Sequence, residues 1–165
     1  MTEAWLSGPV DGVSRELQPA AHALLHARAD ITSALELVPA GKLWERPGAA
    51  PSVGFHVLHA CGALDRLLTY ARDAQLSDAQ RDALRLETQA GPSDYDEAAL
   101  RALAHARIED ALDQLRNTAP AHLYDHRGVG RKALPSNVAG LVFHAAEHTA
   151  RHAGQAISTA RFFGV

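Results

Sequence analysis

Two histidines stand four residues apart near the C-terminal end of the chain, in the stretch EHTARHAGQ at residues 147–155. In an α-helix, side chains at positions i and i+4 are neighbours, so His148 and His152 could reach one small cation. Neutral imidazole suits Zn, Ni, Cu or Fe. Two ligands are too few for a tight site, so a metal centre needs a third donor from another helix. The alternative is that the two histidines only share a helix face.

Long helices must position these histidines. Alanine and leucine dominate the sequence, and clusters of Gly and Pro cut it into long pieces, which favours helices. We predict long helices over residues 13–38, 52–73, 93–117 and 136–162, and a short one over 77–89. Ser77 and Gln80 form a capping box for the short helix, and Ser93 can cap the third long helix.

Amphipathic helices of this length must bury their apolar stripes against one another. The sequence therefore predicts an all-α fold, a four-helix bundle with one short extra helix between the second and third long helices. A chain of 165 residues is most simply one domain, covering residues 1–165. Residues 120–135 form a long connection, and the topology of the bundle stays open.

The direction of each side chain around its helix separates two pairs of histidines with the same spacing. At about 100° per residue, His148 and His152 lie about 20° either side of Leu141, on the apolar stripe of the last helix. His22 and His26 lie about 140° and 180° away from the stripe of the first helix and are expected to face solvent. Burying two imidazoles without hydrogen-bond partners costs free energy, and a metal ion would be a partner for both.

The second helix offers a third donor in the run HVLH, which contains His56 and His59. His56 lies inside the apolar arc of that helix and His59 just beyond its edge, so the geometry slightly favours His56. His144, at the edge of the last helix's stripe, is a further histidine whose contribution stays open. If no metal binds, the same side chains are hydrogen-bonded core histidines.

Two stretches resemble the DinB-like (DinB/YfiT) four-helix-bundle superfamily of metalloenzymes: SVGFHVLHACGALDRLLTYA in the second helix and HAAEHTARHAGQ in the fourth. The resemblance extends over nearly the whole chain. It implies a divalent metal ion, Zn or Ni above all, held by three histidines. Carried onto this chain, the ligands are His59, His148 and His152, against the slight geometric preference for His56.

Characterised members of that superfamily include maleylpyruvate isomerases and bacillithiol-dependent S-transferases. The resemblance therefore implies a metal-dependent transferase that uses a low-molecular-weight thiol on a small-molecule substrate, in detoxification or stress response. It also implies a homodimer. A cluster before the last helix offers cations for the carboxylates of the thiol, and is otherwise a solvated basic loop: His126, Arg127, Arg131 and Lys132. The alternative function is a non-catalytic, metal-stabilised binding or dimerisation module.

Five further residues have interpretations to be tested. Gln155 matches the x-G-Q of the family and is placed to hydrogen-bond the nearby histidine or a metal-bound water, or simply to cap a polar edge. Gly154 is expected to permit close helix packing. Arg107 is expected to extend past the edge of its apolar arc to water, or else to bind substrate. Asp65 belongs to a polar edge or orients a histidine, and Cys61 is a small buried side chain.

Composition excludes several other classes. A net charge of −3 gives no electrostatic reason to expect nucleic acid or a membrane surface as a partner. No apolar run approaches the ~20 residues of a membrane span, no secretory signal is expected, and a single cysteine fits a reducing cytoplasm. The chain contains neither the E-x-x-H of di-iron bundles nor the H-E-x-x-H of zinc proteases.

Overall fold

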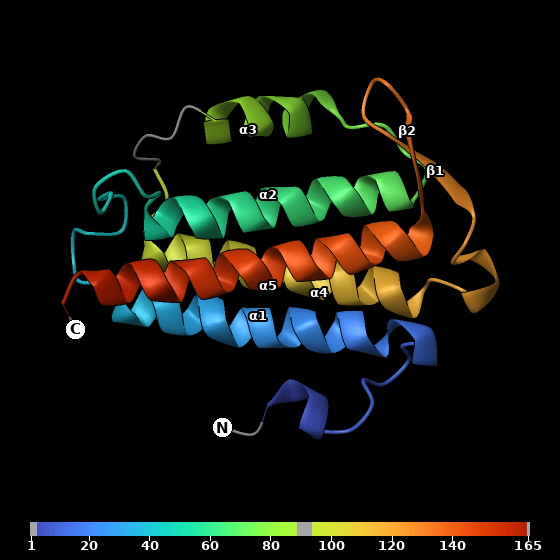
Figure 1. The fold of residues 1–165 in the computed structure, drawn as a ribbon, viewed down its shortest axis with the longest axis horizontal. Coiled ribbons are helices and arrows are strands. Elements are labelled where there is room, and N and C mark those ends of the chain that lie inside the picture. Colours follow the sequence, from blue (N-terminus) through green and yellow to red (C-terminus); the bar gives the residue numbers. More distant parts are fainter. Residues whose placement is uncertain (1–2, 89–93, 165) are drawn as a thin grey trace.

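Four long helices form a bundle, with a shorter helix beside it (Figure 1). The structure is a computed structural model that describes residues 3–88 and 94–164. The long helices are α1 (Gln18–Leu37), α2 (Val53–Ala71), α4 (Glu97–Arg116) and α5 (Val138–Phe162). The short helix is α3 (Asp78–Thr88), and three single 3₁₀ turns are η1 (Ala4–Leu6), η2 (Arg15–Leu17) and η3 (Pro120–His122). The predicted all-α fold, with its extra helix between the second and third long helices, is confirmed.

The topology, which the sequence left open, follows from which helices touch. Both α1 and α2 pack extensively against α4 and α5, while α1 and α2 scarcely contact each other and so lie diagonally opposite. The colours of Figure 1 show that α1 and α5 run in one direction and α2 and α4 in the other. Because α2 and α5 are antiparallel neighbours, the N-terminal half of α2 lies against the C-terminal half of α5.

Side-chain caps mark where the helices begin. Ser52 accepts a hydrogen bond from the Phe55 amide at the start of α2, and Asn137 accepts one from Gly140 at the start of α5. The predicted capping box of Ser77 and Gln80 forms at α3, with reciprocal N···O distances of 2.9 and 3.2 Å.

The start predicted for the third long helix is wrong by several residues. That helix begins at Glu97, because the Asp96 side chain accepts a hydrogen bond from the Ala99 amide and so takes the capping position. Ser93, the predicted cap, lies outside the described residues. The start of the last helix is also displaced, from 136 to Val138, because Ser136 and Asn137 pair with a neighbouring strand.

A small β-hairpin occupies the connection that we predicted only as a long loop. Strand β1 (His126–Val129) pairs antiparallel with β2 (Leu134–Asn137), in a register that places His126 opposite Asn137. Strands of four residues are too short for alternation in the sequence to reveal. A hydrogen bond joins the hairpin to the C-terminal end of α2: the Nε of Arg127 donates to the Ala71 carbonyl at 2.9 Å.

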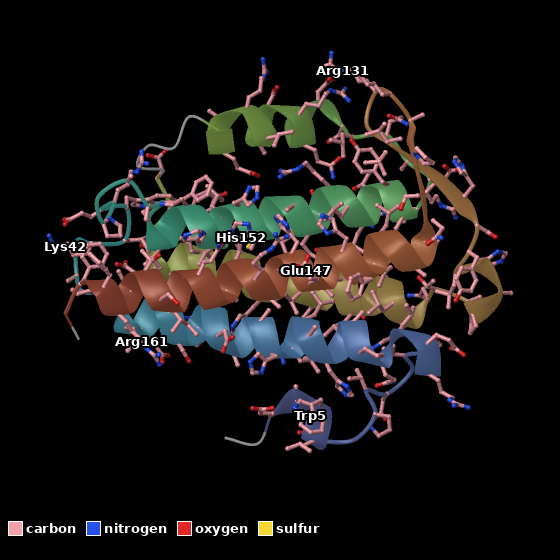
Figure 2. The ribbon with its side chains drawn as sticks, in the orientation of Figure 1. Trp5, Lys42, Arg131, Glu147, His152 and Arg161 are labelled. Carbon is pink, nitrogen blue, oxygen red and sulfur yellow. The ribbon has the colours of Figure 1, made fainter. Side chains whose placement is uncertain are left out.

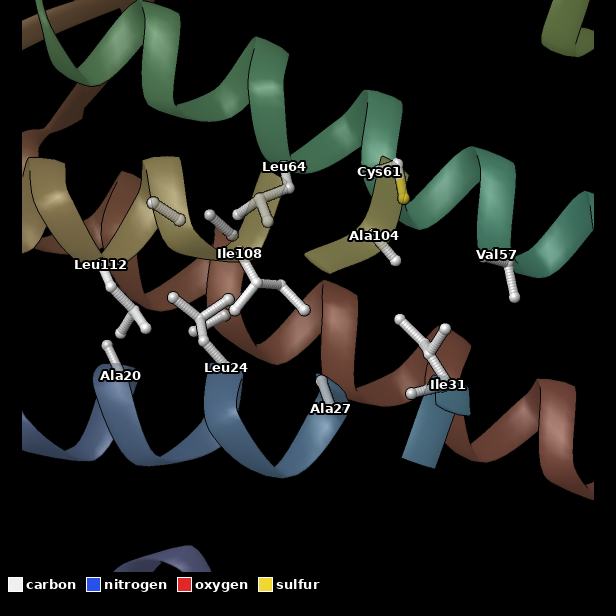
Figure 3. Packing of buried hydrophobic residues seen from close by; sticks show 14 of the residues in the cluster. Ala20, Leu24, Ala27, Ile31, Val57, Cys61, Leu64, Ala104, Ile108 and Leu112 are labelled. Atoms are coloured by element: carbon white, nitrogen blue, oxygen red, sulfur yellow. The ribbon is translucent and has the colours of Figure 1, made fainter. Parts of the chain in front are cut away.

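The core lies along the axis of the bundle, where stripes from all four long helices meet. Figure 3 shows Leu24 of α1 beside Ile108 and Leu112 of α4, and Ile31 of α1 beside Ala104 of α4. Many of the positions between such large side chains are alanines, which allow the helix axes to approach closely. Within the described residues, no helix combines the length and apolar character needed to cross a bilayer.

Candidate metal centre

Three histidines from two helices converge where α2 passes α5. His59 of α2 and His148 and His152 of α5 each offer one ring nitrogen, and these nitrogens lie within 4.8 Å of one another. The Nε2 atoms of His59 and His148 are 3.1 Å apart, and Figure 2 labels His152 between the two helices. The antiparallel packing of α2 and α5 brings the His59 position opposite the pair on α5. Three imidazoles this close could bind one metal ion.

The environment keeps two of these imidazoles neutral. Burial and the neighbouring His59 lower the pKa of His148 to about 4 and that of His152 to about 3. Both are therefore deprotonated at neutral pH, which is the form that binds metals. The two side chains are only partly buried, however, because the fully buried face of α5 consists of smaller residues such as Ala145, Thr149 and Ala153. They flank the apolar stripe rather than lying within it.

His56 is buried, as its place in the apolar arc predicted, and its ring contacts that of His152. Its Nδ1 lies 3.1 Å from the Nδ1 of His152, so one of these two nitrogens must carry the proton. Burial, followed by His59, lowers the pKa of His56. His144 stays on the exposed side, with its Nδ1 3.4 Å from the Glu147 carboxylate. Neither belongs to the group of three that offers mutually close nitrogens.

A buried ion pair holds the far side of His59. The Nδ1 of His59 donates to Glu87 Oε2 at 3.1 Å, and the Arg66 guanidinium donates to both carboxylate oxygens at 2.7 and 2.9 Å. Burial alone would raise the pKa of Glu87, but hydrogen bonds from His59 and Arg66 outweigh it and lower that pKa. A proton on Nδ1 leaves the Nε2 of His59 as its free lone pair, facing the other two histidines.

Sequence reasoning placed Arg66 on a polar edge of the bundle but missed Glu87 and the buried ion pair between them. A weak signal was present, because His59, Gly62, Arg66 and Thr69 follow one another at spacings of three or four, which places a polar stripe along one face of α2. Nothing in the sequence indicated that the short helix α3 would lie over that stripe and supply the carboxylate.

Arg151 constrains the proton of His148. Its guanidinium, which can only donate, lies 3.0 Å from the Nδ1 of His148, so that nitrogen accepts and the proton sits on Nε2. His148 can then donate a hydrogen bond through Nε2 to the Nε2 of His59. The proton of His59 is on Nδ1, which donates to Glu87. A metal at Nε2 of His148 requires the opposite tautomer, so Arg151 must first move away.

The sequence matches one model of a known protein family. Residues 23–156 match the model of the DinB superfamily, a span that includes all three clustered histidines. The chain belongs to the DinB superfamily. No curated protein sequence matches it significantly.

The second histidine pair of this DinB-superfamily chain lies elsewhere, as predicted. His26 is exposed and 3.4 Å from the Asp30 carboxylate, and His22 contacts the Gly8 carbonyl at 2.9 Å. The basic cluster also lies away from the site. Arg127 bonds the last residue of α2, twelve positions and therefore about 18 Å along the helix from His59. Figure 2 shows Arg131 at that same end of the bundle, far from His152. Arg131 and Lys132 are exposed, whereas Arg127 is half-buried on β1 and fixed to α2.

The interpretations of five other residues have mixed outcomes. Gln155 is exposed and, among the described residues, makes no hydrogen bond to His152. Gly154 does not permit close packing, since a Cβ there would meet nothing within 4 Å. Asp65 orients no histidine but accepts from Gln80 at 2.9 Å, and Arg107 extends to a half-exposed position 3.8 Å from Asp65. Cys61 is a buried core side chain whose pKa burial raises to about 12.

Proposed function

We propose that this protein binds a divalent metal ion, Zn or Ni, through His59, His148 and His152, and uses it in a thiol S-transfer reaction. The observation that carries the proposal is the convergence of three ring nitrogens within 4.8 Å. The donor set fits such an ion, because at least two of the imidazoles are neutral at physiological pH and all belong to the ligand class these metals prefer.

The protein's own groups prepare the site in three ways. Glu87 accepts a hydrogen bond from the Nδ1–H of His59, so the lone pair on Nε2 points toward the other two histidines. Phe55 stacks on the His59 ring, with an interplanar angle of 3°, and restricts its rotation. The His59 side chain stays 26% exposed, so a small molecule can approach the cluster from solvent. When bound, a metal with three protein ligands supplies an open position and lowers the pKa of a water or thiol there.

A non-catalytic, metal-stabilised module is the second candidate, and the position of the basic cluster favours it. The cations that we expected to hold the carboxylates of a thiol lie near the other end of α2, and the cation that contacts the clustered histidines is instead Arg151, which also pairs with Glu147. Cys61, the single cysteine, has its thiol in the core and is unavailable as a nucleophile of the chain itself.

Metal content per chain, measured by mass spectrometry on untagged protein, tests the proposal. We expect near-stoichiometric metal in the wild type and its loss in His59→Ala. The matched control is His26→Ala, which removes an exposed histidine from α1. Low-molecular-weight thiols are then assayed with electrophiles. Turnover that disappears in His59→Ala supports the enzyme, whereas metal bound without turnover, and a lower melting temperature for His59→Ala, supports the structural module. A metal-free wild type after supplementation refutes both.

Three further features are proposals. A homodimer formed through helix faces and a role in detoxification or stress follow from the resemblance, and a cytoplasmic location follows from the single cysteine. Light scattering on purified protein tests the first. We expect a mass twice that of the 17.6 kDa chain, and a monomeric mass at micromolar concentration would refute it.

A further inference from the structure

Helix α3 is attached to the bundle in an unusual way. Among its described side chains, only Glu87 is buried, and Leu84 and Leu86 are both exposed. A surface helix normally docks through an apolar stripe. At the N-terminal end of α3, the Gln80 amide donates to Asp65 and Thr69 of α2 at 2.9 and 2.8 Å. At the C-terminal end the attachment is the Glu87 carboxylate, held by Arg66 and His59.

A cavity beneath α3 increases the share of the Glu87 carboxylate in holding this helix to the bundle. A cavity of about 180 Å³ lies between α2, α3 and α4, and Gln80, Ala83 and Glu87 of α3 form part of its wall. Apolar packing between α3 and the bundle is therefore incomplete. Segments with few buried apolar contacts open at low free energy, so the contacts of Glu87 have a large share in keeping α3 closed.

Gly62 is the feature of α2 that admits the carboxylate. A Cβ at this position would lie 1.9 Å from Glu87 Oε1 and 2.7 Å from the Arg66 guanidinium. Any larger residue would therefore displace the Glu87 carboxylate and the Arg66 guanidinium from the positions that they hold here. Because Gly62 has no side chain, the Glu87–Arg66 ion pair can lie against α2 and join α3 to it.

From these contacts we propose that Glu87 is a positioning residue for His59 and that metal binding and the docking of α3 are coupled. The inference rests on the proposed metal site. Glu87 selects the tautomer of His59 whose Nε2 is free, and a metal at Nε2 in turn holds the Nδ1 proton that Glu87 accepts. The coupling is reciprocal: the factor by which docked Glu87 tightens metal binding is the factor by which metal stabilises docked α3.

Two measurements on the full chain test the coupling, with Zn²⁺ alone as the ligand. The first is the Zn²⁺ dissociation constant of Glu87→Ala, which we expect to be about 10- to 100-fold weaker, the usual range for loss of a partner behind a ligand histidine. Glu87→Gln keeps an acceptor for His59 and should recover part of this loss. Asp82→Ala removes an equal charge from an exposed position of α3 and should bind like the wild type.

The second measurement is hydrogen exchange of the α3 amides. Zn²⁺ should slow their exchange in the wild type by up to the fold-change found for Glu87→Ala, and should leave it unchanged in that variant. Gly62→Ala gives an independent route, because it retains Glu87 but displaces its carboxylate, while alanine favours the helix itself. It should weaken Zn²⁺ binding as Glu87→Ala does.

The outcomes separate the coupling from the metal site. If the wild type binds Zn²⁺ but Glu87→Ala and Gly62→Ala bind it within twofold of the wild type, the coupling is refuted and the metal site stands. The coupling is also refuted if the wild type binds Zn²⁺ but the exchange of α3 does not change. If the wild type binds no Zn²⁺, the proposed metal site fails and the coupling fails with it.

Discussion

Helices α1 and α5 each carry two histidines four residues apart, yet the two pairs have different surroundings. On α1, His22 and His26 contact a backbone carbonyl and a surface carboxylate, one at 2.9 Å and one at 3.4 Å. On α5, His148 and His152 contact other imidazoles from α2 and lie at a helix–helix seam. The spacing is identical, so it cannot be what distinguishes a ligand pair from a surface pair.

One feature of the surroundings distinguishes them. The pair on α5 is opposed by histidines on a neighbouring helix, which gives ring nitrogens that point at one another. Burial and neighbouring imidazoles also lower the pKa of both histidines on α5. A pair of histidines becomes a candidate metal site when a second helix supplies a further donor and the environment removes the competing proton.

The largest expected effect comes from removing each pair in turn. His148→Ala with His152→Ala should weaken Zn²⁺ binding by more than about 100-fold, because loss of an outer partner alone costs about 10- to 100-fold. His22→Ala with His26→Ala removes the same two groups from α1 and should leave the dissociation constant within about twofold. Competition titration with a chromophoric chelator measures both. An equal loss in the two double variants would show that the pairs are equivalent and would contradict the comparison.

A helical wheel converts sequence spacing into direction, which is how sequence reasoning separated the two pairs. It placed His26 outside and His56 inside, and both placements hold, but His22, also placed outside, is half-buried. It was less accurate for His148 and His152, which it put on the stripe and which lie at its border. The wheel treats every position of the stripe alike, whereas close packing at the alanines of α5 leaves only the centre of the seam fully buried.

The contacts that sequence reasoning missed depend on elements brought together from distant parts of the chain. Glu87 reaches His59 across 28 positions, and its place depends on how α3 folds back over α2. The choice of His59 over His56 likewise came from the resemblance, since the wheel favoured His56. Helical periodicity predicts which way a residue points, but the partner it meets depends on topology, which the wheel does not contain.

A pH series sharpens the comparison with a smaller effect. A histidine in the unfolded chain has a pKa near 6.5, whereas the pKa values of His148 and His152 are lowered to about 4 and about 3 in the folded protein. Between these values the unfolded chain binds more protons than the folded one, so the free energy of unfolding falls as pH falls from about 6.5 towards 4. Metal-free wild type should therefore lose melting temperature between pH 7 and pH 5.

The variant His148→Asn with His152→Asn isolates this contribution, because the carboxylates that also titrate are common to both proteins. Its melting temperature should fall by a few degrees less than that of the wild type over the same pH interval, with each measured by circular dichroism in chelator-treated buffer. Parallel curves for the two proteins would show that these imidazoles titrate alike in the folded and unfolded states, and the argument from lowered pKa values would then fail.

The smallest expected effect has the opposite sign. Arg151 donates to the Nδ1 of His148 and so stabilises the tautomer whose Nε2 carries the proton. Arg151→Met removes this donor and a positive charge beside the site, and frees Glu147, which Arg151 otherwise contacts at 3.2 Å. Zn²⁺ binding should tighten by about two- to fivefold, the range set by the modest energy of exposed charged pairs.

Arg161→Met is the matched control, since it removes the same charge ten residues further along α5. That distance is about 15 Å, which exceeds the screening length of about 8 Å at physiological salt. At 1 M salt the electrostatic part of the Arg151→Met effect should disappear and the part due to the His148 tautomer should remain. Weaker Zn²⁺ binding by Arg151→Met would mean that the guanidinium supports the metal-loaded site. The α5 pair would then need its exposed neighbour on the same helix as well as the histidines of α2.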